Sequence, residues 1–244
     1  MSMRYKGAVL SATAPVTSSS SAQGIWTMRQ QLQAVGGTGW PVPPPTIGQA
    51  FGGGYYAGKI STTADGVATH YLIVAPKASG ENSSRTWGTY GTATGFTSVI
   101  NGPTNTAGEA ALGAAYQAAK FCEDLNIGDY SDWYLPAKNE LEVLYYNLKP
   151  TTTANNTSSG ANTNAVLPEP YNTNYTSGSP AQTSATGING FRTGEANAFA
   201  SGVYWSSTEG YAYDAWGQVF GNGEQFNPGK DYSTNVRAVR RVPI

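Results

Sequence analysis

Apolar residues recur at helical spacing in two stretches near the middle of the chain. In the first, an apolar stripe runs from Leu112 to Leu125, with Asn105 or Thr106 as its cap, and predicts a helix over about residues 105–125. In the second, Leu141 and Leu148 bound an apolar face that begins after a proline and ends before another. The sequence therefore predicts two neighbouring amphipathic helices.

Strand patterns lie on both sides of these helices. Residues 52–60 and 70–75 flank a turn at Asp65-Gly66 and predict a β-hairpin. Three further strand-like runs follow the helices, at residues 202–206, 215–220 and 236–242. The expected fold class is α+β.

The remaining composition divides the chain into three expected parts. Residues 1–45 are small and polar, apart from a short helical pattern over 24–33 and a proline-rich end, and are expected to be an attachment arm. Residues 46–103 are expected to form a small β-rich region, and residues 104–244 a C-terminal domain. Within that domain, residues 151–198 hold a Thr/Asn/Ser/Gly-rich insertion, and the sequence leaves open whether it is ordered or binds a ligand.

Charge and cysteine content exclude several classes of protein. The 244 residues contain 14 Lys+Arg and 15 Asp+Glu, and only 12% are charged, about half the usual share. A polar but nearly uncharged surface suits an extracellular or virion protein, and it argues against nucleic-acid binding. No apolar run is long enough for membrane insertion, and the apolar start at residues 8–10 is too short for a signal peptide. A lone cysteine, Cys122, excludes an intrachain disulfide and is expected to be a core residue.

Three ordered motifs carry a family resemblance. They are DWYLPAKNEL at residues 132–141, YWSSTE at 204–209, and a pair formed by AW at 215–216 with VRAVR at 236–240. Over about residues 105–243 the chain resembles the DUF1566 family, also called the Lcl C-terminal domain. That family is similar to the C-type-lectin-like superfold, shared with formylglycine-generating enzymes and with variable proteins of diversity-generating retroelements. The resemblance implies two helices packed on a twisted antiparallel sheet with long loops.

The same resemblance implies that most motif residues are structural. Arg237 and Arg240 are expected to brace the core. The residues expected to fill it are Trp133, Leu135, Pro136, Tyr204, Trp205 and Trp216.

A second, shorter resemblance lies nearer the N-terminus. Residues 24–29 and the GGGYYAG segment at 52–58 resemble the start of tailed-phage fibre and tail proteins. The two resemblances imply a phage virion tail fibre or receptor-binding protein, located in the virion tail and extracellular after release. Its expected partners are a host-surface glycan or protein and, through the arm, other tail proteins, in a homotrimer. The alternative is a purely structural decoration or joining subunit whose lectin-like head binds other virion proteins.

Catalysis has little support in the residues. The sole histidine, His70, precedes an apolar strand, so neither a catalytic triad nor a histidine-rich metal site can be assembled. The paired cysteines that bind copper in formylglycine-generating enzymes are absent. Asp214 and Glu224 could form a glycosidase pair, but acidic residues in polar loops are more often exposed than catalytic. We therefore expect no enzyme activity and no cofactor.

Binding is better supported, by aromatic and amide residues between positions 209 and 232. Flat rings stack on sugar faces, while amides and carboxylates bind hydroxyl groups. The oxygen atoms of Asp214, Asn222, Glu224 and Asn227 could also bind calcium, but no strict spacing predicts a metal. The expected ligand-binding residues are Tyr211, Tyr213, Asp214, Asn222, Glu224, Gln225 and Asn227.

Overall fold

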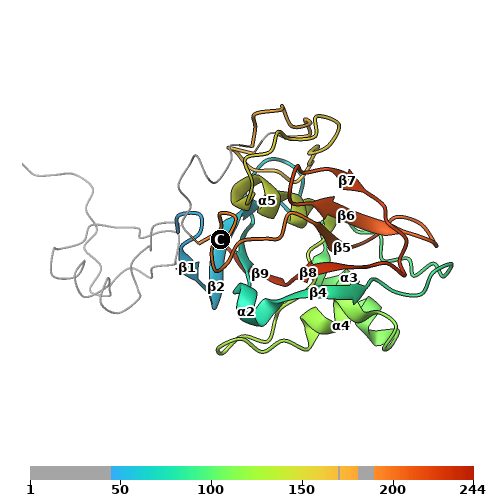
Figure 1. Cartoon of the computed structure of the whole chain (residues 1–244). Coiled ribbons are helices and arrows are strands. Elements are labelled where there is room, and N and C mark those ends of the chain that lie inside the picture. Colours follow the sequence, from blue (N-terminus) through green and yellow to red (C-terminus); the bar gives the residue numbers. More distant parts are fainter. Residues whose placement is uncertain (1–44, 170, 181–189) are drawn as a thin grey trace, which may run out of the picture. The chain divides into compact units, whose positions relative to one another are not determined.

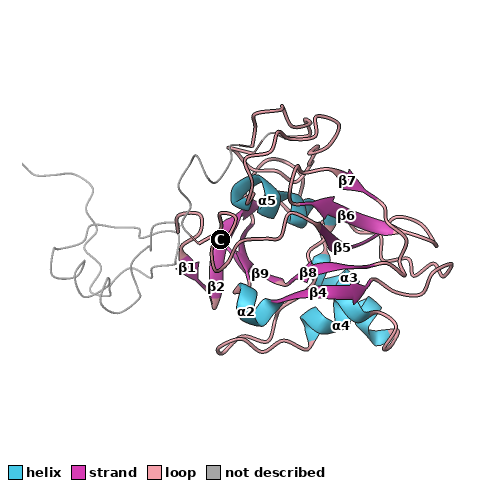
Figure 2. Ribbon diagram, viewed as in Figure 1, coloured by secondary structure: helices cyan, strands magenta, loops and turns pink. Residues whose placement is uncertain are grey.

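Two β-sheets and four helices make up the part of the chain that the computed structural model describes, which is residues 45–169, 171–180 and 190–244 (Figures 1 and 2). The first sheet has the order β1-β2-β3-β9, formed by Ala50–Phe51, Gly54–Ile60, His70–Val74 and Val239–Pro243. The second has the order β4-β8-β5-β6-β7, formed by Glu81–Thr86, Ser233–Arg237, Val203–Glu209, Ala215–Val219 and Gln225–Phe226. All neighbouring strands are antiparallel except β5 and β8, so the predicted α+β class is confirmed.

The predicted hairpin is present as β2 and β3, with Ile60 opposite His70. Strand β3 also pairs with β9 from the far end of the chain, and Val74 lies opposite Val239. Because of this pairing, Pro45–Pro243 form one compact unit, and the predicted border between residues 46–103 and 104–244 does not divide it. The predicted arm at 1–45 lies, up to residue 44, outside the described residues.

The single helix predicted over residues 105–125 is wrong, because the chain forms two helices there. Helix α3 spans Gly102–Ala111 and helix α4 spans Gln117–Glu123. Between them Gly113 has a φ of 109°, a conformation that interrupts a helix. Thr106 caps neither helix; its hydroxyl accepts a hydrogen bond from the Leu135 N–H at 3.0 Å.

The second predicted helix is present as α5, Lys138–Leu148. Its start is fixed by Glu140, whose carboxylate accepts the Ala137 N–H at 2.8 Å and the Tyr134 hydroxyl at 2.7 Å. Helix α5 packs against β2 of one sheet and against β5 and β6 of the other, so it joins the two sheets. Helices α3 and α4 contact the second sheet through β5, β4 and β8, and the short helix α2, Lys77–Gly80, leads into β4.

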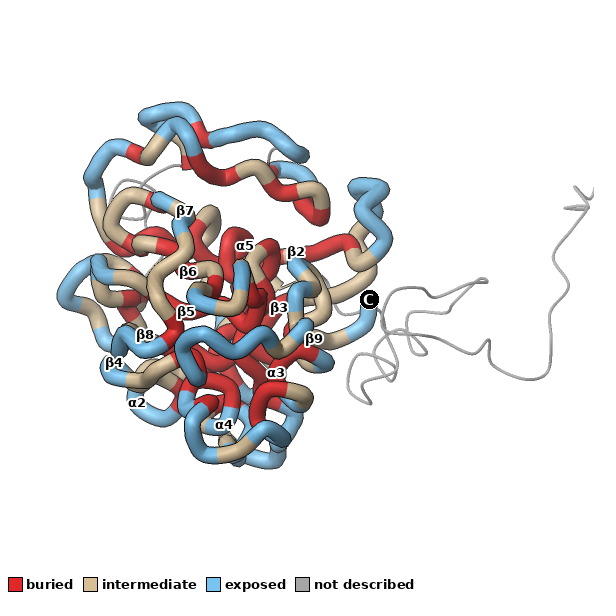
Figure 3. The backbone as a smooth tube through the Cα atoms, turned by 90° about the vertical axis from the view of Figure 1, so that its right-hand side faces the viewer, coloured by how far each residue is buried: buried red, intermediate tan, exposed pale blue. Residues whose placement is uncertain are grey.

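The core contains most of the motif residues that the sequence assigns to it. Trp133, Leu135, Pro136, Tyr204 and Trp205 are buried, and Figure 3 shows buried backbone gathered at α5, β2 and β5. Trp216 is only partly buried and is the exception. Both predicted braces are confirmed by ion pairs: Arg237 with Glu81 at 2.8 Å, and Arg240 with Asp132 at 2.7 Å.

Part of the Thr/Asn-rich insertion is held on α5 by a buried polar network. The Glu142 carboxylate accepts hydrogen bonds from the Asn162 amide at 2.6 Å and the Tyr175 hydroxyl at 2.8 Å. Burial raises the pKa of Glu142 to about 7, although these two hydrogen bonds oppose the rise. The Asn139 amide donates to Asn164 at 2.7 Å, and Asn164 donates in turn to the Ser61 carbonyl. These bonds explain how a low-complexity segment packs against the domain without a large apolar face.

Candidate functional site

A tight turn between β5 and β6 presents two of the predicted tyrosines to solvent. The N–H groups of Gly210 and Tyr211 both donate to the Asp214 carbonyl at 3.1 Å. A Cβ atom at Gly210 would lie 2.3 Å from the Asp214 Oδ1 atom, so any larger residue here would displace the Asp214 side chain. Tyr211 and Tyr213 remain 72% and 56% exposed, which leaves their rings free for a partner.

Tyr213 lines a surface pocket of about 340 Å³, here called the tyrosine pocket. The rings of Tyr90 and Tyr213 lie 5.1 Å apart at 60°, and Tyr232 is 65% exposed. Exposed tyrosines grouped around a pocket present flat, amphipathic faces to a ligand. The residues that line the pocket are Tyr90, Tyr213, Asp214, Asn227, Gly229, Asp231 and Tyr232.

A buried ion pair fixes the loops on either side of this pocket. The Lys230 ammonium pairs with the Glu209 carboxylate and donates to the Thr92 carbonyl at 2.8 Å. Glu209 also accepts the N–H groups of Thr94 and Gly95, both at 2.7 Å. Burial alone would raise the pKa of Glu209, but the hydrogen bonds from Lys230 and from the two N–H groups outweigh it and lower the pKa. The pair thereby ties the loop that carries Tyr90 to the loop between β7 and β8.

Two oxygen atoms at the tyrosine pocket have no hydrogen-bond partner among the described residues. They are Oδ1 of Asp214 and Oδ1 of Asn227, and both are buried from solvent. Buried acceptors without partners are uncommon, and a bound ligand with hydroxyl or amide donors would satisfy them. The pocket therefore combines aromatic faces with two buried acceptors that lack partners and with the exposed carboxylate of Asp231.

The structure divides the seven predicted site residues among three places. Tyr213, Asp214 and Asn227 line the tyrosine pocket, with Tyr211 exposed in the adjoining turn. Gln225 lines a different, smaller pocket. Asn222 and Glu224 lie in the turn between β6 and β7, where the Glu224 N–H donates to the Asn222 Oδ1 atom at 3.1 Å, and they line neither pocket.

The prediction missed four residues of the tyrosine pocket: Gly229, Asp231, Tyr232 and Tyr90. Asp231 and Tyr232 lie within the segment that the sequence singles out, and their aromatic-acidic character could have included them. Tyr90 lies more than a hundred residues earlier in a Gly/Thr-rich stretch, and no sequence pattern links it to Tyr213.

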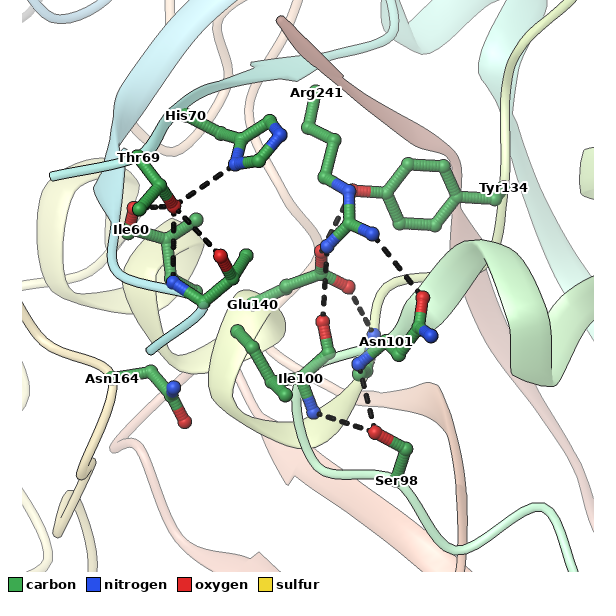
Figure 4. Close-up of polar contacts among 12 residues, drawn as sticks. Ile60, Thr69, His70, Ser98, Ile100, Asn101, Tyr134, Glu140, Asn164 and Arg241 are labelled. Carbon is green, nitrogen blue, oxygen red and sulfur yellow. Dashed lines mark hydrogen bonds and ion pairs between the residues drawn. The ribbon is translucent and has the colours of Figure 1, made fainter. Parts of the chain in front are cut away.

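The only histidine of the chain lies in a polar cluster that serves the fold (Figure 4). The His70 Nδ1 atom lies 2.9 Å from the Thr69 hydroxyl, and burial followed by the charge of Arg241 lowers its pKa. Arg241 donates to the Ile100 carbonyl at 3.2 Å and lies 3.5 Å from the Glu140 carboxylate. Burial raises the pKa of Glu140 to about 7, and Arg241 opposes the rise. Arg241 and Glu140 therefore contact each other and the residues that start α3 and α5, whereas the hydrogen bond of His70 is with its neighbour Thr69.

Metal and membrane features can be assessed only for residues 45–169, 171–180 and 190–244. Within these ranges, no group of three or more His, Cys, Asp or Glu side chains is placed to hold a metal ion. Of the oxygen donors considered for calcium, the structure brings Asp214 and Asn227 to one pocket. The described helices include none long and apolar enough to cross a membrane.

The fold and the motifs agree with one protein family. The sequence profile of the Lcl C-terminal domain matches residues 78–240, and the chain belongs to this family. The matched range begins earlier in the chain than residue 105, where the resemblance noted from the motifs begins. It therefore includes β4 and the loop that carries Tyr90. No curated protein matches the chain.

Proposed function

We propose that this chain is a phage virion protein, a tail fibre or receptor-binding protein that recognises a host-surface glycan or protein through the tyrosine pocket. The observation that carries the proposal is the exposed group of Tyr90, Tyr213 and Tyr232 around the unpartnered oxygens of Asp214 and Asn227. Rings that stack on sugar C–H faces beside acceptors for hydroxyl groups are what glycan recognition requires.

The proposed fold is C-type-lectin-like. It is supported by helices packed on antiparallel-rich sheets and by the long loops that carry the tyrosine pocket. The low charge content supports a place in the virion, extracellular after release. We propose a homotrimer that is attached to other tail proteins through its first 45 residues. Its three binding sites would act together, so that a weak affinity of each site for the host surface gives a high avidity of the trimer.

The proposed activity is binding without catalysis. Asp214 lines the tyrosine pocket, but Glu224, its partner in the glycosidase pair considered above, does not. A pocket in which only one member of such a pair is present supports recognition rather than hydrolysis.

The test is binding of the full chain to a panel of bacterial cells and their purified surface polysaccharides. A Tyr213→Ala/Tyr232→Ala variant should bind about tenfold more weakly or worse, because each ring contributes about 0.5–1.5 kcal/mol. Tyr171→Ala is the matched control, since Tyr171 is 50% exposed and lies outside the tyrosine pocket. Binding that survives the double change would exclude this pocket. A folded oligomer that binds no cell but binds virion proteins would favour the structural alternative.

A further inference from the structure

A second pocket lies between the start of α5, the β6–β7 hairpin and the insertion. It has a volume of about 130 Å³ and is here called the Lys138 pocket. None of the described residues that line it carries a carboxylate, whereas the tyrosine pocket has two. Its lining residues are Lys138, Ser158, Ser159, Gly160, Ala161, Asn174, Trp216 and Gln225.

The charge in this pocket comes from Lys138. Its ammonium lies 3.8 Å from the centre of the Trp216 ring, and it forms no ion pair with any residue that the structure describes. The carboxylate one turn along the helix, Glu142, is already bound by Asn162 and Tyr175. Burial lowers the pKa of Lys138, and the charge of Glu142 opposes this. No carboxylate of the described residues lies within ion-pair distance of this half-buried cation.

Two neutral donors line the same pocket as this cation. The Gly160 N–H donates to the Oε1 atom of Gln225 at 3.1 Å, which fixes the orientation of the amide. The Nε2 atom of Gln225 is then buried without an acceptor among the described residues. The Ser159 hydroxyl oxygen accepts a hydrogen bond from the backbone N–H of Gln225 at 3.0 Å, so the hydroxyl hydrogen of Ser159 stays available for donation. The pocket is rich in donors and poor in acceptors.

We propose that the Lys138 pocket binds the carboxylate group of an acidic sugar. The Lys138 ammonium supplies the charge, the amide of Gln225 and the hydroxyl of Ser159 donate to the two oxygens, and the edge of the sugar packs beside Trp216. One cation with two neutral donors matches a singly charged, planar anion better than a phosphate dianion. In naming a sugar the inference rests on the proposed function, whereas carboxylate binding rests on the three donors alone.

The experiment is an NMR titration of the full chain with sodium glucuronate at constant ionic strength. The indole N–H resonance of Trp216, assigned by its loss in Trp216→Phe, should shift saturably with glucuronate and not with neutral methyl glucoside. Lys138→Gln should weaken binding about tenfold or more, and Lys138→Arg should restore most of it. Lys120→Gln, which removes the same charge from helix α4, is the matched control and should bind as the parent does.

Each outcome decides for or against the inference. It is wrong if the folded parent shows no saturable shift with glucuronate, if Lys138→Gln binds equally well, or if sulfate shifts the resonance and glucuronate does not. Should Lys138→Gln fail to fold, Gln225→Met removes one donor and must also weaken binding. Glucuronate binding that persists in Tyr213→Ala/Tyr232→Ala, a variant that loses cell binding, supports both sites separately. If the parent binds glucuronate but no cell or polysaccharide, the proposed function fails and the carboxylate site remains.

Discussion

Replacing Lys230 with methionine removes the positive partner of a buried carboxylate beneath the tyrosine pocket. The side chains of Lys230 and Glu209 are 0% and 4% exposed. The change would leave the negative charge of Glu209 with only the N–H groups of Thr94 and Gly95, and it would free the Thr92 carbonyl. Breaking a buried pair from one side costs about 3–5 kcal/mol, and the two remaining N–H donors place the expected loss near 3 kcal/mol.

The loss should depend on pH. The pKa of Glu209 is lowered in the folded parent, so the pair stabilises the fold above the unfolded pKa of about 4.3 and loses this contribution as the pH falls through the folded pKa. Without Lys230, burial dominates and raises the pKa of Glu209. The stability difference between Lys230→Met and the parent should therefore be largest near neutral pH and should shrink in acid.

Urea unfolding at about pH 7 and about pH 4 measures the size of the stability loss and its dependence on pH. In thermal unfolding at neutral pH, the melting temperature should fall by roughly 6–12 °C. Lys120→Met is the control, because the pair that it breaks with Asp124 is exposed and should contribute under about 1 kcal/mol. A loss below about 1 kcal/mol in Lys230→Met at neutral pH, or one that is independent of pH, would show that the Lys230–Glu209 pair does not stabilise the fold as described.

Three further predictions follow from buried and tightly packed positions. Both carboxylate oxygens of Glu109 are buried without partners among the described residues, and burial raises the pKa of this group, so the stability of the fold falls as the pH rises. In urea unfolding, Glu109→Met should therefore be more stable than the parent by about 1 kcal/mol or more at about pH 8, and by less at about pH 5. Asn162→Ala removes the amide that donates to the Glu142 carboxylate and to the Asn139 carbonyl, and it should destabilise the domain by about 2 kcal/mol. Hydrogen exchange should become faster within residues 151–180, and unchanged exchange there would contradict the network. Gly210→Ala should push the Asp214 side chain from the tyrosine pocket and weaken ligand binding, whereas Gly178→Ala, with nothing within 4 Å of the new carbon, should bind normally.

The sequence predicts individual helices and strands well, but it predicts the pairing of distant strands and the breaks within helices less well. Alternating patterns locate β2 and β3 correctly, and the stripe bounded by Leu141 and Leu148 locates α5. The pairing of β3 with β9 is invisible to local patterns because it joins residues more than 160 positions apart. The break at Gly113 was missed because alanine-rich helical spacing continues across it.

The candidate site was predicted in part, for a similar reason. Aromatic and amide composition pointed to the segment that holds Tyr213, Asp214 and Asn227. The same composition also included Asn222 and Glu224, because it does not show which side of a hairpin a residue faces. Tyr90 joins the site through the buried Lys230–Glu209 pair, a contact between distant loops that only the folded chain reveals.

The most direct test of ligand recognition by the tyrosine pocket is a ligand footprint on the tyrosine rings. The full chain, labelled with fluorinated tyrosine, would be titrated by fluorine NMR with a surface polysaccharide that it binds, and the resonances assigned by Tyr→Phe changes. The resonances of Tyr90, Tyr213 and Tyr232 should shift together while that of Tyr171 stays in place. Saturable binding that leaves all three of the pocket tyrosines unchanged would contradict ligand recognition by this pocket.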